Sequence, residues 1–461
     1  MFENILGQPV TEQLSRDIKA SVLASSMLFS GPPASGKGTT ALELGRILSC
    51  EAPPAPWSCS CPACSRHRLL LHPDLLLLGP RSFGAEIAAA SAAFLREPEN
   101  LAAGLLFIRS VRKLLARFSP LLWEDDVKKF KDISPLILQL EESLDDLEAW
   151  RNRVEGGANG GANGGAESGL EKINGAILKN AFKLEAEGIA ETIPISQIRR
   201  AAYWSRLAPV GKRKLLLIEN ADRMQEGGRN ALLKILEEPP ERVCIVLASA
   251  QSRALLPTIL SRLRPYRFFA RDEDAEREVI RRVFRNAGME EDASLSAPVG
   301  RGNRITAYLD SFLPVSDERL YALAACFTAS LAYRGARALR NRKLPDVLVF
   351  LGKYTTSIAE AAGLERTGDA GAAVAQVLAG TENFDAPGLF SRFLKNILSL
   401  VSESLRSAPV SGGVPPEGIS LAEAMKRLTA EAASAVGVYN QSPALALERC
   451  CAEFQRFVTE L

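Results

Sequence analysis

One short segment, GPPASGK at residues 31–37, constrains the fold of this chain more than any other feature. It matches the first seven positions of the phosphate-binding pattern G-x-x-x-x-G-K-[ST]. A short apolar run, residues 27–30, precedes it, and TTALELGRIL follows with helical periodicity. Between a strand and a helix, the backbone N–H groups of such a loop surround phosphate while the lysine reaches the terminal phosphates. We therefore expect Gly31, Gly36 and Lys37 to bind nucleotide.

The eighth position departs from the pattern, because Gly38 stands where a serine or threonine hydroxyl normally holds magnesium. Hydroxyls return only at Thr39 and Thr40, and Thr39 would substitute if the start of the helix shifted. Phosphoryl transfer with a poorly fixed metal loses a main source of charge neutralisation. We expect ATP or ADP to contact Gly38 and Thr39, and the sequence leaves the magnesium ion undecided.

A second apolar run, residues 215–218, leads into Glu219 and Asn220. In P-loop ATPases such a strand ends in an aspartate for the metal and often in a glutamate that activates water. Asn220 cannot accept a proton from water as a carboxylate does, so a general base is missing there.

Further apolar runs at 74–78 and 244–248 lie between helical stretches, which predicts a parallel sheet with helices on both faces. The 461 residues have room for about three domains. Residues 81–190 have only helical periodicity, with Ser134 and Pro135 predicting a helix start. The repeat around GGANGGANGG predicts a flexible linker at residues 156–169.

Four cysteines crowd together at Cys50, Cys59, Cys61 and Cys64. Thiolates at this spacing can close a tetrahedral structural zinc site, and nothing indicates an open catalytic position. The single residue between the second and third cysteines departs from the usual two CxxC-like steps, and His67 is a substitute ligand. Free buried thiols are the alternative.

The overall charge gives no sign of an autonomous nucleic-acid binder, because 56 Lys and Arg face 54 Asp and Glu. Any DNA contact must be local or shared. The first residues, MFENILGQPV, lack a signal-peptide pattern, and no run of about 18 apolar residues occurs. We expect a cytoplasmic protein with no membrane partner.

Two segments closely resemble bacterial DNA polymerase III clamp-loader subunits, which are AAA+ ATPases. They are NALLKILEEPP at residues 230–240 and PTILSR at 257–262. The opening FENILGQ looks like the entry segment of the same family, and YNQSP at 439–443 is fainter and looks like its collar.

The resemblance implies an α/β P-loop AAA+ domain followed by a small helical lid and an all-α collar for oligomerisation. On this chain the implied limits are 1–80 and 191–270 for the nucleotide-binding domain, including a zinc module at 50–64, 81–190 for a helical insertion, 271–313 for the lid and 314–461 for the collar. The insertion is either a lineage-specific addition or a partner-binding arm.

The resemblance also implies roles for three residues outside the loop. Arg262 matches the arginine that this family presents to the nucleotide of the neighbouring subunit, where it stabilises charge on the transferring phosphate. Ser249 falls at the nucleotide-sensing polar position, although Ala250 replaces a second expected hydroxyl residue. Arg304 lies near the expected lid arginine.

Within this family, delta-prime subunits often have degraded metal sites while retaining the arginine. Gly38, Glu219 and Asn220 therefore favour a delta-prime-like subunit without ATPase activity of its own. Its implied partners are the gamma/tau motor, the delta subunit, the sliding clamp and primer-template DNA. Two alternatives stay open, namely a gamma/tau-type motor that uses Thr39 and Glu219 in shifted roles, and a nucleotide-free scaffold.

Overall fold

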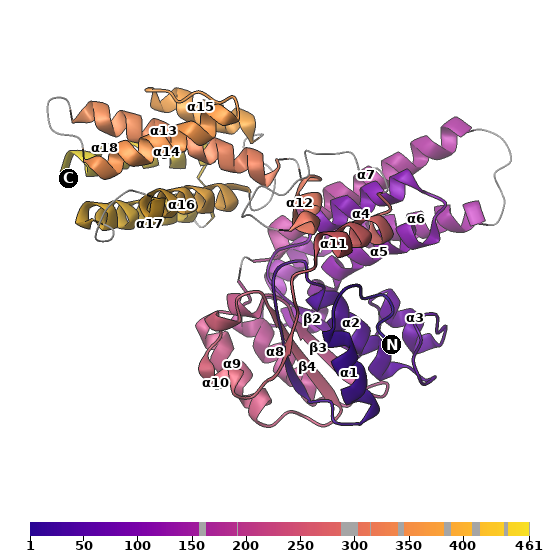
Figure 1. The fold of residues 1–461 in the computed structure, drawn as a ribbon. Coiled ribbons are helices and arrows are strands. Elements are labelled where there is room, and N and C mark those ends of the chain that lie inside the picture. The colour runs from indigo at the N-terminus through magenta and orange to yellow at the C-terminus, as the bar shows by residue number, and fades with distance from the viewer. Residues whose placement is uncertain are drawn as a thin grey trace. The chain divides into compact units, whose positions relative to one another are not determined.

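The chain forms two compact units, Met1–Phe312 and Leu313–Leu461. The computed structural model, drawn in Figure 1, describes residues 1–155, 163–190, 192–286, 303–313, 315–339, 345–381, 389–407, 415–437 and 441–460. No helix in these ranges is long and apolar enough to cross a membrane.

The first unit is built on a five-stranded sheet in the order β2-β3-β4-β1-β5. All neighbouring strands are parallel. Four strands overlap the predicted apolar runs, and the fifth was missed because it is short and arginine-rich. The strands are β1 Ser26–Ser30, β2 Leu75–Leu78, β3 Lys214–Ile218, β4 Val243–Ser249 and β5 Arg264–Arg267. Pro265 is tolerated in β5 because that strand lies at the sheet edge.

Helices cover both faces of the sheet, as predicted, because successive side chains of each strand enter different cores. Leu216 packs in one core, and its neighbour Leu217 packs in the other. One face is covered by α1 Val10–Lys19, α2 Lys37–Ser49 and α3 Pro62–Arg68. The opposite face is covered by α8 Ile195–Arg206, α9 Glu226–Glu237 and α10 Pro257–Leu260.

The described residues of the insertion, 81–155 and 163–190, form a helical region whose core is continuous with the core on the second sheet face. Its helices are α4 Gly84–Arg96, α5 Leu101–Leu115, α6 Val127–Glu155 and α7 Asn163–Gly188, with short turns η1 Ala116–Phe118 and η2 Pro120–Trp123 between α5 and α6. The pairs α4–α5 and α6–α7 pack closely. The insertion is therefore anchored to the sheet rather than attached as a separate body.

The predicted helix start at Ser134 and Pro135 is wrong, because α6 runs through Pro135 and the Ser134 hydroxyl donates to the carbonyl of Phe130 at 2.7 Å. Of the predicted linker at 156–169, residues 156–162 lie outside the described residues, and α7 begins at Asn163.

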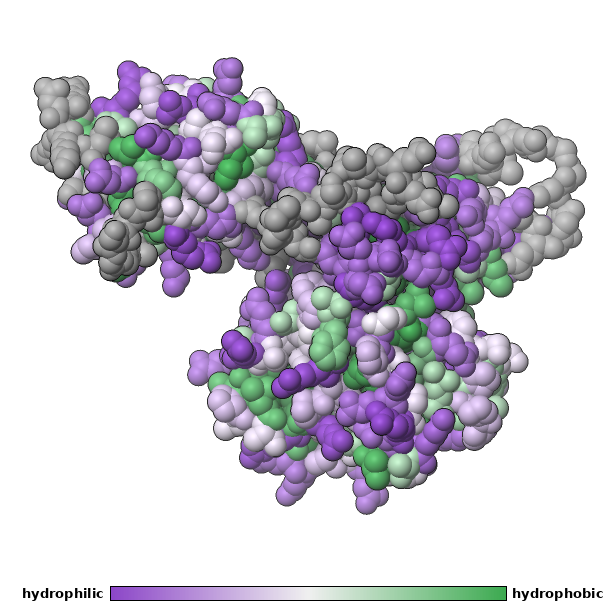
Figure 2. Space-filling model, viewed as in Figure 1, coloured by the Kyte–Doolittle hydropathy of each residue, from purple (hydrophilic) through white to green (hydrophobic). Residues whose placement is uncertain are grey.

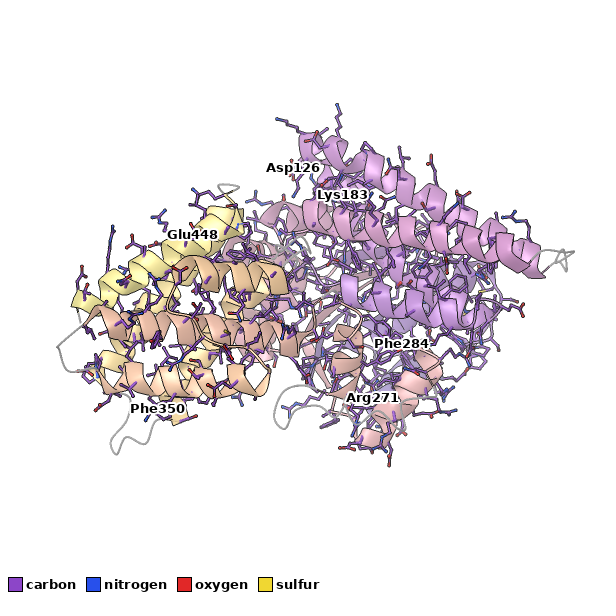
Figure 3. The ribbon with its side chains drawn as sticks, turned by 90° about the horizontal axis from the view of Figure 1, so that it is seen from above. Asp126, Lys183, Arg271, Phe284, Phe350 and Glu448 are labelled. Carbon is purple, nitrogen blue, oxygen red and sulfur yellow. The ribbon has the colours of Figure 1, made fainter. Side chains whose placement is uncertain are left out.

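Two further helices, α11 Glu273–Val283 and α12 Arg304–Asp310, pack on α4 of the insertion. Ala89 and Ala93 meet Phe284 and Tyr308 in a small separate core. Arg96 donates to the carbonyl of Phe284 at 2.7 Å, and Figure 3 marks Phe284 just beyond the end of α11. The solvent face over α11 is strongly hydrophilic (Figure 2), as its charged sequence requires.

In the second unit, the regular elements of the described residues are all helices. They are α13 Asp317–Ala338, α14 Asp346–Ala361, α15 Ala370–Gly380, α16 Leu389–Ser407, α17 Pro416–Gly437 and α18 Pro443–Glu460. Phe327, Phe393 and Phe454 lie in its core. Residues 439 and 440 of YNQSP lie outside the described residues, and the predicted domain limits stay predictions.

Candidate nucleotide and zinc sites

The loop of residues 31–37 joins β1 to α2 at the carboxyl edge of the sheet. Gly36 takes a left-handed conformation, with φ 89°, and α2 begins at the next residue. A Cβ at Gly31 would lie 2.4 Å from the carbonyl oxygen of Phe268, so only glycine fits there. The predicted strand, loop and helix are present, and the loop has the shape that its glycines demand.

Lys37 folds back over this loop. Its ammonium donates to the carbonyls of Gly31 and Pro32 at 2.8 and 2.5 Å and to the Ser35 hydroxyl at 3.1 Å. Burial lowers the pKa of Lys37 to about 8, against the opposing effects of Asp222 and Glu219. The lysine is therefore positioned over the loop, and its charge is sensitive to mildly alkaline pH.

Two side chains that the sequence did not indicate donate hydrogen bonds to backbone carbonyls of the loop. Arg271 donates to the carbonyl of Ala34 at 2.6 Å and to that of Leu6 at 3.0 Å. Asn303, which caps α12, donates to the carbonyl of Pro33 at 3.0 Å. No local pattern predicts these contacts, because more than 230 residues separate the partners.

Gly38 faces the carboxylate of Glu219 across the site. A Cβ at Gly38 would lie 2.4 Å from Glu219 Oε1, so the carboxylate fills the space that a serine or threonine side chain would need. Thr39 is exposed, and the Thr40 hydroxyl donates to the carbonyl of Gly36 at 2.9 Å. The Thr40 hydroxyl is thus engaged within α2, and the substitute role of Thr39 stays a prediction.

Glu219 is neutralised by two cations from the insertion. Lys113, in α5, lies 3.4 Å from Oε1, and Arg117, in η1, pairs with Oε2. The side chain of Arg117 is only 4% exposed and that of Glu219 is 15% exposed. Burial alone would raise the pKa of Glu219, but the two ion pairs outweigh burial and hold the pKa below its usual value.

The residues at this edge do not fit a magnesium ion held in the usual way. The hydroxyl ligand is absent at Gly38, and the Glu219 carboxylate already has two cationic partners. Asn220 follows in a left-handed conformation with φ 47°, which asparagine tolerates better than most residues. Asp222 accepts a hydrogen bond from the Ser249 hydroxyl at 2.5 Å.

The structure brings Ser249 to the loop, because β4 and β1 pair in register with Ser249 opposite Ser30. The backbone N–H of Gly31 donates to the carbonyl of Ser249 at 3.3 Å. Arg304 begins α12, next to the Asn303 contact with the loop, but its guanidinium pairs with Glu273 at 3.1 Å. Its assignment as a nucleotide ligand stays a prediction.

Arg262 does not belong to the group of residues around the loop of residues 31–37. It follows α10 and donates to the carbonyl of Thr258 at 2.7 Å and to Glu237 Oε1 at 2.8 Å. The side chains of Arg262 and Glu237 are 34% and 49% exposed. Glu237 belongs to the LEEPP segment, so the two segments that resemble the family meet at the surface.

The four predicted cysteines form one cluster, with all four sulfurs within 4.8 Å of one another. The sulfurs of Cys50 and Cys59 lie 3.7 Å apart. Tetrahedral zinc with Zn–S bonds of about 2.3 Å separates its sulfurs by roughly 3.8 Å. Arg46 also donates to the Cys64 sulfur at 3.0 Å. The donor set therefore fits a structural zinc ion.

His67 does not belong to this cluster. Its Nε2 hydrogen-bonds the Ser49 hydroxyl at 2.9 Å, and its ring stacks on His72 with centroids 4.1 Å apart. Its alternative role as a fourth ligand is not needed, because four thiols already meet.

Comparisons with known proteins match part of the chain. The family model described as DNA polymerase III, delta subunit, matches residues 167–272. A DNA polymerase III subunit delta' of Pseudomonas aeruginosa is 42% identical over 82 residues, which cover 18% of this chain and 25% of that protein. A DNA polymerase III subunit gamma/tau of Mycobacterium bovis is 33% identical over 94 residues, 20% of this chain and 16% of that protein.

A solved structure of a DNA polymerase III gamma subunit-related protein from Thermotoga maritima is 20% identical. The match covers 58% of this chain and 80% of that one, but its TM-score of 0.26 is too low to support a shared fold. The chain thus spans a quarter or less of the length of the curated relatives it matches. The family model and these relatives show that the matched part of the chain, which includes residues 167–272, is similar to DNA polymerase III clamp-loader subunits of the delta' and gamma/tau kinds.

Proposed function

We propose that the chain is a delta-prime-like clamp-loader subunit, with an AAA+ nucleotide-binding domain that no longer hydrolyses ATP. The observation that carries this proposal is the pairing of Glu219 with Lys113 and Arg117 opposite Gly38. A motor needs that carboxylate and a hydroxyl for magnesium, and it needs a base for water. Here the carboxylate is already paired, the hydroxyl is absent and Asn220 is no base.

The proposed active contribution comes from Arg262, in trans. Its guanidinium is at the surface and is held by an exposed glutamate, so a neighbouring subunit can reach it without disturbing a core. An arginine supplied to a partner's ATP site stabilises charge on the transferring phosphate. The collar would hold the ring together, with gamma/tau and delta as neighbours. Sliding clamp and primer-template DNA are the proposed targets of the assembled complex.

The test is reconstitution with candidate gamma/tau and delta subunits, comparing wild type with Arg262→Ala. We expect normal assembly and a DNA-stimulated ATPase reduced by about 10³-fold at the site that faces this subunit, since trans arginines contribute factors of that order. Arg264→Ala, an exposed arginine in β5, is the matched control. Full activity of Arg262→Ala would remove the trans role, and ATP turnover by the isolated chain would favour the gamma/tau alternative.

A structural zinc ion at the cysteine cluster is part of the same proposal. Cys50 ends α2, the helix that begins in the P-loop, so the metal would fix the far end of that helix. We expect about one zinc per chain by metal analysis. Its removal should lower the free energy of unfolding by about 2.7 kcal/mol at a free zinc concentration a hundredfold above Kd. Stability unchanged by chelation, with no zinc found, would leave free thiols as the answer.

A further inference from the structure

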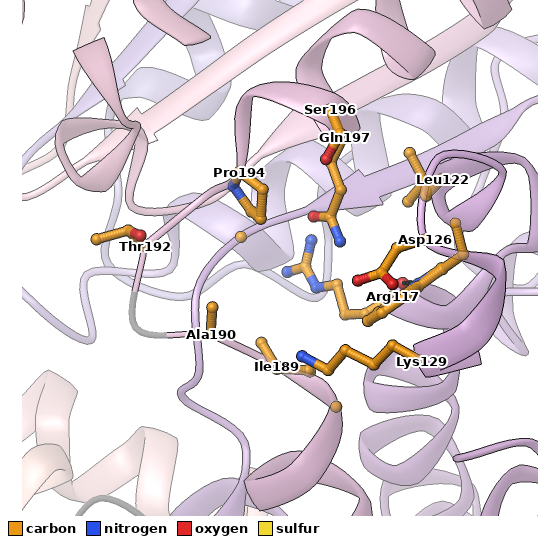
Figure 4. Close-up of a pocket in the computed structure, with 13 residues that line it drawn as sticks. Arg117, Leu122, Asp126, Lys129, Ile189, Ala190, Thr192, Pro194, Ser196 and Gln197 are labelled. Atoms are coloured by element: carbon orange, nitrogen blue, oxygen red, sulfur yellow. Dashed lines mark hydrogen bonds between the residues drawn. The ribbon is translucent and has the colours of Figure 1, made fainter. Parts of the chain in front are cut away.

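A pocket of about 90 Å³ opens beside the Glu219 cluster, between the insertion and the first turn of α8. Figure 4 shows the Arg117 guanidinium in its wall, with the side chains of Lys129 and Gln197 nearby. The pocket is separate from the loop of residues 31–37, whose residues do not line it. The pocket and the ion pairs of Glu219 have Arg117 in common, because Arg117 lines the pocket and also pairs with Glu219.

Arg117 has hydrogen-bonding capacity that the protein does not use. Its Nη2 donates to Glu219, whereas Nε and Nη1 have no partner among the described residues, although both are shielded from bulk solvent. The guanidinium also lies over the ring of Phe83, 5.3 Å from the centroid, which does not satisfy in-plane donors. Buried unpaired donors are costly. A group that accepts hydrogen bonds in the pocket would remove that cost.

The first turn of α8 supplies a second, independent set of donors. The backbone N–H groups that open a helix have no partner within it, and the N-cap residue Pro194 offers α8 no side-chain cap. The N–H of Ile195 donates to Gln225 Oε1 at 3.4 Å, so the next two N–H groups, of Ser196 and Gln197, are the donors that the proposal uses. Ser196 and Gln197 of that turn line the pocket and carry polar side chains. Helix N-termini of this kind favour anions.

The charged side chains around the pocket come from several elements. Lys129 in α6 lines it and adds a cation, whereas Asp126, just before α6, adds an exposed carboxylate. Behind Arg117, Glu219 is shared with Lys113, which also pairs with Glu86 at 3.0 Å. The positive and negative formal charges around the pocket nearly cancel. Binding of an anion therefore depends more on which groups face the pocket than on the net charge. Arg117, Lys129 and the first turn of α8 all line this one small space, and the Lys129 ammonium lies over the Trp123 ring, 5.6 Å from its centroid.

We propose that this pocket binds a small tetrahedral oxyanion, namely inorganic phosphate or the phosphoryl end of a monoester. Arg117 and the α8 N-terminus would donate to its oxygens and Lys129 would add charge, while Asp126 limits the affinity. Arginine is suited to such a group because its planar donors match two oxygens at once. The volume favours a group of the size of free phosphate over a nucleotide.

The test is calorimetric titration of the full-length chain with inorganic phosphate at constant ionic strength. It uses a Lys37→Ala background, so that the P-loop contributes no phosphate signal. We expect saturable binding that weakens at least about tenfold in Lys129→Gln and in Gln197→Glu, the loss expected for a charge-assisted contact. Asp126→Asn should have the opposite effect and tighten binding. Lys128→Gln, the same change at an exposed neighbour on α6, should leave it unchanged.

Two ligands decide the source of the anion. If glycerol phosphate binds more tightly than inorganic phosphate, the ligand is the phosphoryl end of a larger molecule. If acetate binds as tightly as phosphate, the proposal of a tetrahedral oxyanion is wrong. No saturable phosphate binding in the Lys37→Ala chain would also overturn the proposal. So would equal affinity in Lys129→Gln and Gln197→Glu when thermal unfolding shows both variants folded. Because hydrolysis plays no part in this test, its failure is distinct from failure of the proposed clamp-loader role.

Discussion

The two arginines that matter most, Arg117 and Arg262, hold glutamates in opposite environments. Arg117 is 4% exposed and shares Glu219 with Lys113, whereas Arg262 is 34% exposed and meets the half-exposed Glu237. A buried pair cannot release its partner without leaving a charge stranded, but a surface pair exchanges partners at little cost. Glu219 is therefore held firmly within this chain, whereas Arg262 can exchange its partner, as its proposed role in trans requires.

The largest expected effect comes from breaking the buried pair. Arg117→Met keeps side-chain bulk but leaves Glu219 with Lys113 alone, so the free energy of unfolding should fall by about 3–5 kcal/mol in urea denaturation. Adding Glu219→Gln should recover more than half of this loss, because the stranded charge is then gone. Arg112→Ala breaks the pair with Glu148, whose side chain is 37% exposed; it is the control and should cost less. If Arg117→Met lowers the free energy of unfolding by less than about 1 kcal/mol, the Arg117 pair is no stronger than a surface pair such as that of Arg262.

The next largest effect is the pH dependence of binding at Lys37, the cation of the loop. Lys37 has a pKa of about 8, so it is charged below that pH and neutral above it. The affinity of the loop for nucleotide or phosphate should therefore fall by at most about tenfold between pH 8 and pH 9, as one pKa unit implies. Titrations at pH 7, 8 and 9 measure this, with Lys37→Ala as the flat reference. An affinity that stays constant to pH 9 would mean that Lys37 does not hold the phosphates.

The smallest effect is expected at the surface pair. Glu237→Gln should change the free energy of unfolding by less than about 1 kcal/mol, because both side chains are well exposed. Glu238→Gln makes the same charge change at the next residue and should behave alike. In the reconstituted complex, Glu237→Gln should leave the ATPase near wild type. A stability loss above about 2 kcal/mol would show that Glu237 locks Arg262 as firmly as Arg117 is locked.

The sequence predicts the sheet well, because buried parallel strands are continuous apolar runs that a single chain displays directly. It misses β5, where only Tyr266 is buried and the pattern disappears. It also predicts the cysteine cluster, since those ligands are close in the chain. It cannot predict that Arg117 meets Glu219, because 102 residues separate them and only the packing of the insertion on the sheet brings them together. The insertion, expected to be either a lineage-specific addition or a partner-binding arm, supplies both cations that pair with Glu219.

We propose that Lys113 and Arg117 of the insertion replace the magnesium site of a motor subunit by pairing with Glu219. Equilibrium binding of ATP to the purified chain, measured once with magnesium and once with a chelator, tests it most directly. The zinc content is checked in both samples, so that loss of the structural metal is not mistaken for an effect at the loop. We expect the same affinity for ATP in both conditions and no ATP turnover. Binding strengthened tenfold or more by magnesium, with turnover lost in Lys37→Ala, would contradict it.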